Sequence, residues 1–258
     1  MRRGTALVPA LMLAVTLSAC SDTSTLASPT ELTVFAASSL TAVFTDEVGP
    51  AFEAANPGVK VVFNFGASDS LAGQIQSEGS ADVFASASGT WMDAVAEDPG
   101  VTGRTDFARN RLVIVTPVED PGDISTIDDL ANPDVQLVLA AEGVPVGDYA
   151  RQALDGAGIL AEAEANVVSN EEDNASVVAK VAAGEADAGI VYESDVSGPA
   201  GNDLRAVEIP ADVNVTATYP IAVVAGAAEQ ALAAGFVDYV TSAEGQALLE
   251  SYGFRPVT

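Results

Sequence analysis

Short apolar runs alternate with amphipathic stretches along most of the chain. Apolar runs of strand length lie at residues 32–36, 59–65, 82–85, 112–116, 135–139, 167–168, 188–192 and 219–224. Helical spacing of apolar residues occurs at residues 40–54, 71–76, 91–96, 147–154, 175–183, 229–241 and 243–251. This alternation predicts an α/β fold in which mainly parallel sheets are flanked by helices.

The last elements of the chain predict two lobes. A strand and two helices remain after residue 218, where a second α/β unit is already complete. We therefore expect the chain to return to its first unit, so that lobe I comprises residues 31–113 and 219–258 and lobe II comprises residues 114–218. The two crossings, near residues 112–115 and 219–222, are predicted to form a two-strand hinge.

Residues 1–20 have the features of a targeting segment. Two arginines precede an apolar run that is too short to cross a bilayer comfortably. The run ends in Leu-Ser-Ala-Cys at Cys20, which resembles a bacterial lipobox and predicts a lipoprotein signal peptide with Cys20 as the lipidated residue. An ordinary secretory signal with an incidental cysteine is the alternative. Cys20 is the only cysteine, so an intramolecular disulfide is excluded.

The residues after Cys20 predict where the protein resides. Residues 21–30 are small and polar, which is typical of a flexible tether. No later segment has the length and apolar character of a transmembrane helix. We therefore expect an extracytoplasmic protein that is held by a lipid anchor at the outer face of the cell membrane.

The charge balance limits the possible partners. The chain has 37 acidic and 10 basic residues; cleavage before Cys20 removes two arginines and leaves 8 basic residues and a net charge of −29. Such a surface repels nucleic acid and anionic lipid. The acidic residues are scattered, which favours a role in solubility and predicts a soluble monomer with no nucleic-acid partner. An anionic ligand would have to be held by local dipoles.

Two strand ends followed by hydroxyl residues are candidate anion sites. Ser38 and Ser39 follow the strand at residues 32–36, and Ser68 follows Gly66 after the strand at residues 59–65. The free N–H groups of a first helical turn, together with the helix dipole, attract anions. Carboxyl ends of neighbouring parallel strands share one edge of a sheet, where ligands bind in open α/β folds. A simple N-cap role for these serines is the alternative.

Two further motifs lie in the predicted second lobe. A loop of proline and glycine at residues 143–147 opens another helix, and its apolar side chains leave only backbone N–H groups for a ligand. Tyr192 ends a buried strand, where its hydroxyl either donates to a ligand or belongs to a half-buried core residue.

The absence of histidine from the sequence excludes several kinds of chemistry. A Ser-His-Asp triad, a histidine general base and histidine-ligated zinc are not possible. The phosphate-binding loop of nucleotide hydrolases is also missing. We therefore predict a binding protein that is not an enzyme and has no cofactor or resident metal.

In order and spacing, the motifs resemble the extracytoplasmic molybdate-binding proteins of ABC transporters. The landmarks, spread over residues 31–256, are Val34-Phe35-Ala36-Ala37-Ser38-Ser39-Leu40, Phe65-Gly66-Ala67-Ser68, Ala81-Asp82-Val83-Phe84-Ala85-Ser86-Ala87, Val144-Pro145-Val146-Gly147, Gly184-Glu185-Ala186-Asp187-Ala188-Gly189-Ile190-Val191-Tyr192, Tyr219-Pro220-Ile221-Ala222-Val223-Val224 and Tyr252-Gly253-Phe254. The resemblance implies a type II periplasmic-binding-protein fold, with molybdate or tungstate between the lobes and an ABC transporter permease as partner.

The resemblance also implies a set of ligand contacts. Ser39 and Ser68 would each give a hydroxyl and a backbone N–H from lobe I. Val146 and Asn174 would give backbone N–H groups from lobe II, and Tyr192 its hydroxyl. The family usually has an apolar residue at the position of Asn174, and either neighbour of Asn174, Asp173 or Ala175, is a competing assignment.

Some observations leave other ligands and functions open. Asp69 and Asp148 adjoin the proposed contacts, and either carboxylate would oppose a dianion if it pointed inward. The same fold could bind sulfate, phosphate or a small organic acid. A serine hydrolase and a purely structural lipoprotein are more remote alternatives.

Overall fold

The computed structural model describes residues 28–119, 122–197 and 203–257. The predicted signal peptide, the lipidation at Cys20 and most of the tether therefore lie outside the described residues. Within them, we find no helix whose length and apolar character would allow it to span a bilayer.

The strands form one continuous mixed sheet that runs through both lobes in the order β2-β1-β3-β9-β4-β7-β5-β6, with β8 paired to β4. β1 pairs in parallel with β2 and β3, and β5 pairs in parallel with β6 and β7. All antiparallel pairs involve β4 or β9. The strands are β1 (Thr30–Ala37), β2 (Val59–Gly66), β3 (Val83–Ala85), β4 (Val101–Pro117), β5 (Leu137–Ala140), β6 (Val167–Glu171), β7 (Ala188–Tyr192), β8 (Leu204–Glu208) and β9 (Thr216–Val224).

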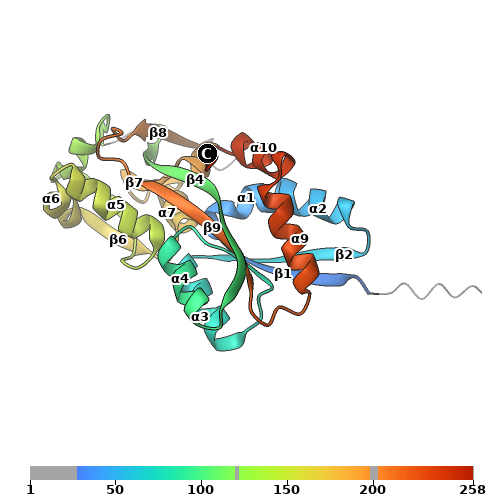
Figure 1. Ribbon diagram of the computed structural model, residues 1–258. Coiled ribbons are helices and arrows are strands. Elements are labelled where there is room, and N and C mark those ends of the chain that lie inside the picture. Colours follow the sequence, from blue (N-terminus) through green and yellow to red (C-terminus); the bar gives the residue numbers. More distant parts are fainter. Residues whose placement is uncertain (1–27, 120–121, 198–202, 258) are drawn as a thin grey trace, which may run out of the picture.

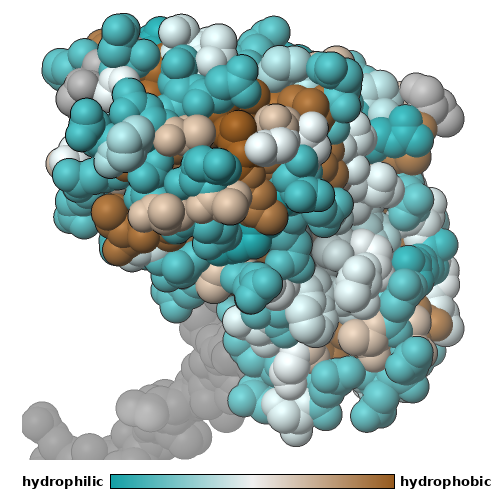
Figure 2. All heavy atoms as spheres, turned by 90° about the vertical axis from the view of Figure 1, so that its left-hand side faces the viewer, coloured by the Kyte–Doolittle hydropathy of each residue, from teal (hydrophilic) through white to brown (hydrophobic). Residues whose placement is uncertain are grey.

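Helices cover the sheet in two separate groups (Figure 1). On lobe I these are η1 (Ser38–Leu40), α1 (Thr41–Val43), η2 (Phe44–Val48), α2 (Gly49–Ala55), α3 (Ser68–Glu78), α4 (Gly89–Glu97), α9 (Gln230–Thr241) and α10 (Ala243–Ser251). On lobe II they are η3 (Ile127–Ala131), α5 (Pro145–Gly156), α6 (Leu160–Ala165), α7 (Asn174–Ala182) and α8 (Glu193–Ser197). The surface facing the viewer in Figure 2 is mainly hydrophilic, with apolar residues gathered in its upper part.

β4 and β9 carry the chain between the lobes. β4 pairs with β9 from Val101 to Arg111, and then with β7 and β8 from Leu112 onward. β9 in turn pairs with β3 of lobe I. The α/β class and the two-lobed arrangement predicted from the sequence are confirmed, whereas the limits of the two lobes stay a prediction. The sheet is mixed and not mainly parallel because these two long crossing strands are antiparallel to their neighbours.

Two elements differ from the sequence-based expectations. The helix predicted at residues 40–54 is divided into η1, α1, η2 and α2, with the π-type turn η2 ending at Val48 and Pro50 in the first turn of α2. Proline has no N–H and its ring crowds the preceding turn, so a regular α-helix cannot continue through it. β4 begins eleven residues before the predicted strand at residue 112. Register shifts against β9 interrupt the alternation of apolar and polar residues in the first half of β4. Periodicity therefore did not predict this part of the strand.

Gly147 allows the first turn of α5 to pack directly against the end of β5. A Cβ at this position would lie 2.3 Å from the carbonyl oxygen of Ala141 and 2.5 Å from that of Ala140. No side chain fits there without moving the helix. The glycine thus fixes where the N-terminus of α5, including Val146, is placed.

We expect Gly147→Ala to lower the free energy of unfolding by about 1–3 kcal/mol, because the added methyl group would overpack this junction. Gly156→Ala, at the other end of the same helix, is the matched control, since its Cβ would meet Val213 at 3.7 Å, an ordinary contact. Urea unfolding of both variants measures the effect. Equal stability of the two variants would contradict this role of Gly147.

Candidate functional site

A small cavity lies where the two lobes meet, with a volume of about 10 Å³. Strand ends and helix starts from both lobes contribute to its wall. The lining residues are Ala37, Ser38, Gly66, Ala67, Ser68 and Ala87 from lobe I, and Val144, Pro145, Val146, Asn174 and Tyr192 from lobe II. None of these residues is charged. The wall therefore offers hydroxyl groups, one amide, backbone groups and methyl groups to a compact ligand.

The parallel strands of each lobe explain why these segments meet. In lobe I, Ala37 at the end of β1 pairs with Gly66 at the end of β2, and a helix follows each of them. In lobe II, α5, α7 and α8 likewise follow the ends of β5, β6 and β7. The carboxyl edges of the two halves of the sheet thus face each other across the cavity, at the position where open α/β sheets bind ligands.

Three helices point uncapped N-termini at this cavity. Their N-cap residues are Ala37 for η1, Ala67 for α3 and Val144 for α5, and none makes a side-chain capping hydrogen bond. These side chains have no acceptor atom. Elsewhere, Ser88 caps α4 and Ser242 caps α10 in the usual way. In α3 the Asp69 carboxylate accepts from the N–H groups of Asp69 and Ser70. The remaining first-turn N–H groups of the three helices have no capping side chain, and an anion is the acceptor that the helix dipoles favour.

This geometry decides between the two interpretations of the hydroxyl motifs. Ser38 and Ser68 are the first residues inside their helices and not N-caps. Ser68 is 1% exposed, and its Oγ accepts a hydrogen bond from the Ala87 N–H at 3.0 Å. Because that bond occupies a lone pair of the hydroxyl, its hydrogen remains available for donation.

Tyr192 brings a second hydroxyl from lobe II. Its side chain is 1% exposed, and its Oη has no hydrogen-bond partner among the described residues. A buried hydroxyl without a partner costs about 1–3 kcal/mol, and at the wall of a cavity such a hydroxyl can donate to a ligand. Burial raises the pKa of Tyr192 well above its usual value, which keeps the group protonated and able to donate.

The structure distinguishes the two adjacent serines. Ser38 lines the cavity, whereas Ser39 lies in an adjoining groove and forms a 2.9 Å hydrogen bond through its Oγ to the Tyr219 hydroxyl. Of the five predicted contacts, Ser68, Val146, Asn174 and Tyr192 are brought together around the cavity, and Ser38 occupies the place expected for the side chain of Ser39. Which of these groups touch a ligand stays a prediction.

Asn174 begins α7 and links the two lobes. Its neighbour Asp173 is the N-cap, accepting from the Ser176 N–H at 2.8 Å, and Ala175 faces the adjoining groove. Asn174 alone of the three competing residues lines the cavity. Its Oδ1 accepts a hydrogen bond from the Ser38 hydroxyl across the lobe boundary.

A second direct contact joins the lobes. Trp91 of α4 donates from Nε1 to the Gly143 carbonyl oxygen at 2.9 Å. Together with the Ser38–Asn174 bond, this contact defines a closed arrangement of the lobes. Trp91 is the only tryptophan of the chain, so its fluorescence can report lobe closure.

Neither of the two acidic residues near the site lines the cavity. Asp148 is turned back to its own loop, where Oδ1 accepts the Gly143 N–H at 2.8 Å. The Oδ1 atom of Asp69 is buried without a hydrogen-bond partner in the described part of the chain. Burial raises the pKa of Asp69, and the nearby Asp148 adds to this effect. The carboxylates thus border the site and leave its wall uncharged.

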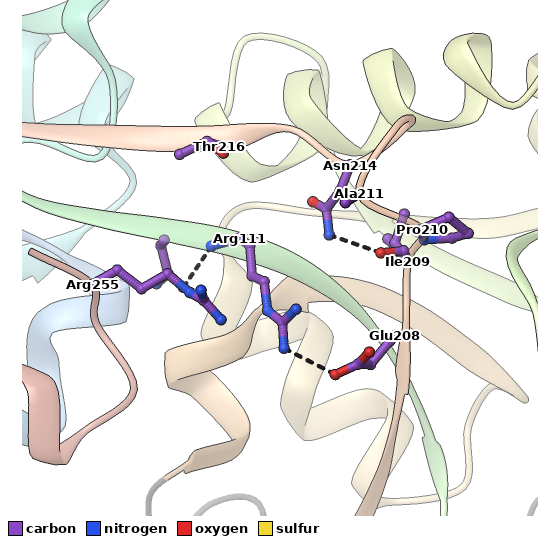
Figure 3. Close-up of a pocket in the computed structure, with 9 residues that line it drawn as sticks. Arg111, Glu208, Ile209, Pro210, Ala211, Asn214, Thr216 and Arg255 are labelled. Atoms are coloured by element: carbon purple, nitrogen blue, oxygen red, sulfur yellow. Dashed lines mark hydrogen bonds and ion pairs between the residues drawn. The ribbon is translucent and has the colours of Figure 1, made fainter. Parts of the chain in front are cut away.

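A larger cavity of about 490 Å³ lies beside the hinge, lined in part by Arg111, Glu208 and Arg255 (Figure 3). The two guanidinium groups are already used in ion pairs. Arg111 contacts Glu193 at 2.8 Å and Glu208 at 3.0 Å, and Arg255 contacts Glu193 at 3.0 Å. These ion pairs connect the hinge, α8 and the C-terminal segment, and none of the predicted ligand contacts lies here.

A closed two-lobed α/β fold with an uncharged, donor-rich cavity between the lobes defines a solute-binding protein. Residues 32–255 match the model of the family described as bacterial extracellular solute-binding protein, and the chain belongs to this family.

Similar proteins include the molybdate-binding protein ModA of Mycobacterium tuberculosis (strain H37Rv), which is 39% identical over 258 residues covering 97% of this chain and 96% of that protein. The periplasmic molybdate-binding protein of Azotobacter vinelandii shares the fold with a TM-score of 0.77 and 21% identity, over 88% of this chain and all of that one. The sulfate-binding protein SubI of M. tuberculosis also shares the fold, with a TM-score of 0.78 and 20% identity over 88% and 87% of the two chains.

We expect Ser38→Ala and Ser39→Ala to have different consequences. Loss of the Ser38 hydroxyl removes a polar group from the cavity wall and should weaken binding of a tetrahedral dianion by about 1–3 kcal/mol. Loss of the Ser39 hydroxyl leaves Tyr219 without this partner and should mainly lower stability. Calorimetric titration with molybdate and urea unfolding measure the two effects. A larger loss of affinity in Ser39→Ala would reverse the assignment.

Tyr192→Phe is expected to separate binding from stability. Removal of an unpaired buried hydroxyl should leave the ligand-free protein equally stable or more stable, whereas affinity for the dianion should fall by about 1–3 kcal/mol. Tyr239→Phe is the matched control, because the Tyr239 hydroxyl contacts Glu244 on the surface of lobe I. If Tyr192→Phe destabilised the ligand-free protein without affecting affinity, the hydroxyl would have a structural role instead.

Proposed function

We propose that this protein captures molybdate outside the cytoplasm and delivers it to the permease of an ABC importer. The observation that carries the proposal is the convergence of three uncapped helix N-termini and the unpaired Tyr192 hydroxyl on one uncharged cavity. The similarity to ModA of M. tuberculosis over nearly the whole chain supports molybdate as the ligand. Tungstate, which has nearly the same size and charge, is proposed as a second ligand.

The physical logic is a match between neutral donors and a fully deprotonated dianion. Molybdate at neutral pH carries no proton, so each protein group that faces it must donate. Backbone N–H groups can only donate, and hydroxyl groups can rotate to do so. Donors without net charge stabilise the anion and avoid the desolvation of a buried cation.

The same match supports selectivity. Hydrogen phosphate would need an acceptor for its proton, but the lining includes no carboxylate and the Asn174 Oδ1 already accepts from the Ser38 hydroxyl. Sulfate has the correct charge but shorter distances between its oxygens, so donors spaced for molybdate would not reach all of them.

Lobe closure would couple ligand binding to transport. Ser38 and Trp91 make interlobe bonds that exist only when the lobes are together. A ligand that is contacted by both lobes shifts the equilibrium toward this form. The permease would then recognise the closed form. We further propose that the protein acts as a monomer, has no catalytic activity, and is anchored through a lipid on Cys20, as the Leu-Ser-Ala-Cys motif supports.

A panel of oxyanions tests the ligand. We expect molybdate and tungstate to bind with one-to-one stoichiometry, to change Trp91 fluorescence, and to raise Tm by about 5–10 °C, because ligand at 100 times Kd adds about 2.7 kcal/mol of stability. Sulfate and phosphate at equal concentration serve as controls and should give much smaller shifts. Binding of sulfate without binding of molybdate would contradict the specificity and leave the class of protein unchanged.

A further inference from the structure

A buried carboxylate sits directly behind the cavity wall. Asp195 in α8 accepts the Tyr192 N–H at 2.9 Å through Oδ2 and the Asn174 side-chain amide N–H at 2.7 Å through Oδ1. Both donors belong to residues that line the cavity. Asp195 thereby orients the Asn174 amide, with its nitrogen turned toward α8 and its oxygen toward Ser38 of lobe I.

This orientation conflicts with the requirement of a dianion. Because the Ser38 hydroxyl donates to the Asn174 Oδ1, its hydrogen is not available to a ligand. The Ser38 Oγ then presents lone pairs, and not its hydrogen, to the cavity. A wall that otherwise consists of donors thus contains one pair with the wrong polarity.

We propose that Asp195 is a positioning residue that reverses this polarity by taking up a proton when the dianion binds, an inference that rests on the proposed oxyanion-binding function. Protonated Oδ1 donates to the Asn174 Oδ1 after the amide turns over by a rotation about its terminal torsion. The Asn174 Nδ2 then donates to the Ser38 Oγ, and the Ser38 hydrogen is released to the ligand. One proton moves from solvent to Asp195, and no covalent bond other than that O–H changes.

The surroundings of Asp195 favour such a proton. Burial is the largest influence and raises its pKa to about 7, although the bonds from Tyr192 and Asn174 oppose this change. Asp173 at the start of α7 is a further negative charge, and the neighbouring groups from β7 and β9 are the neutral hydroxyls of Tyr192 and Tyr219. Among the described residues, no lysine or arginine forms an ion pair with Asp195; Arg111 and Arg255 bind Glu193 instead. A dianion on the other side of Asn174 would add to the preference for the neutral acid.

Linkage gives the expected sign of the pH dependence. If the pKa of Asp195 is about 7 in the closed protein without ligand and higher in the complex, affinity is fully present below pH 7 and falls as pH rises through that window. The decrease approaches about tenfold per pH unit when one proton is bound per ligand. Above the pKa of the complex, the affinity reaches a lower plateau.

Asp195→Asn tests the switch because an amide can imitate the protonated acid. Its Oδ1 can accept the Tyr192 N–H and its Nδ2 can donate to the Asn174 Oδ1. We expect this variant to bind molybdate at about pH 9 as tightly as the wild type does at about pH 6. Asp195→Ala cannot hold the Asn174 amide in either orientation and should bind weakly at both pH values. Asp212→Asn, an exposed position in lobe II, is the control for loss of one negative charge.

Calorimetry of molybdate binding in two buffers with different ionisation enthalpies counts the protons directly. We expect the wild type and Asp212→Asn to take up close to one proton per ligand near pH 8, and Asp195→Asn to take up none. Tight binding by the wild type without proton uptake, or equal uptake by Asp195→Asn, would overturn the switch and leave the proposed function intact. Proton uptake by the wild type alone tests the switch, even if a variant fails to fold. Absence of molybdate binding at every pH would overturn the proposed function itself.

Discussion

The site between the lobes depends on backbone N–H groups of helix N-termini that have no side-chain cap. A helix N-terminus normally receives its cap from serine, threonine, aspartate or asparagine, and the loss of such a cap costs about 1 kcal/mol. Here Ala37, Ala67 and Val144 occupy the cap positions of three helices that converge on one point. Each helix gives up some stability, and together their dipoles and first-turn N–H groups favour an anion without any cationic side chain. This local field explains how a chain with a net charge of −27 can attract an anion at all.

This arrangement of donors requires the two lobes to meet closely. Lobe I contributes η1 and α3, lobe II contributes α5 and α7, and each set alone would leave half of a tetrahedral ligand in water. Closure excludes that water and strengthens every N–H bond to the anion, since the local dielectric falls. The close packing at Gly147 serves the same purpose, because it brings the start of α5 directly against the end of β5. The hinge can remain simple, as two strands with ion pairs beside them, because selectivity resides in the donors and not in the motion.

The sequence predicted the framework well and the details of the site less well. Apolar runs and helical spacing sufficed for both lobes, because the central strands β3, β5 and β7 are buried on both faces and most helices bury one clear face. These patterns failed at Pro50 and in the bulged part of β4, where local geometry interrupts the period. Two adjacent serines at a strand-to-helix turn point in different directions, and periodicity cannot determine which one faces the ligand. A useful signal was nevertheless present, since alanine and valine at three N-cap positions depart from the usual preference. Asp195 could not be found from the sequence, because its role arises only from the contact between α8 and α7.

The Asn174 amide is the point at which structural and functional demands compete. An apolar residue there would leave Asp195 without its amide partner and remove the bond that joins Ser38 of lobe I to lobe II. The amide satisfies both neighbours, but in its present orientation it presents oxygen where the ligand requires hydrogen. A fixed donor at this position would avoid the conflict, yet it would also bind the ligand equally at every pH. Because the two amide orientations differ only by a rotation, the balance between them is set by whether Asp195 is charged or protonated, and a bound dianion favours the protonated acid. The polarity of the site therefore responds to its own occupant.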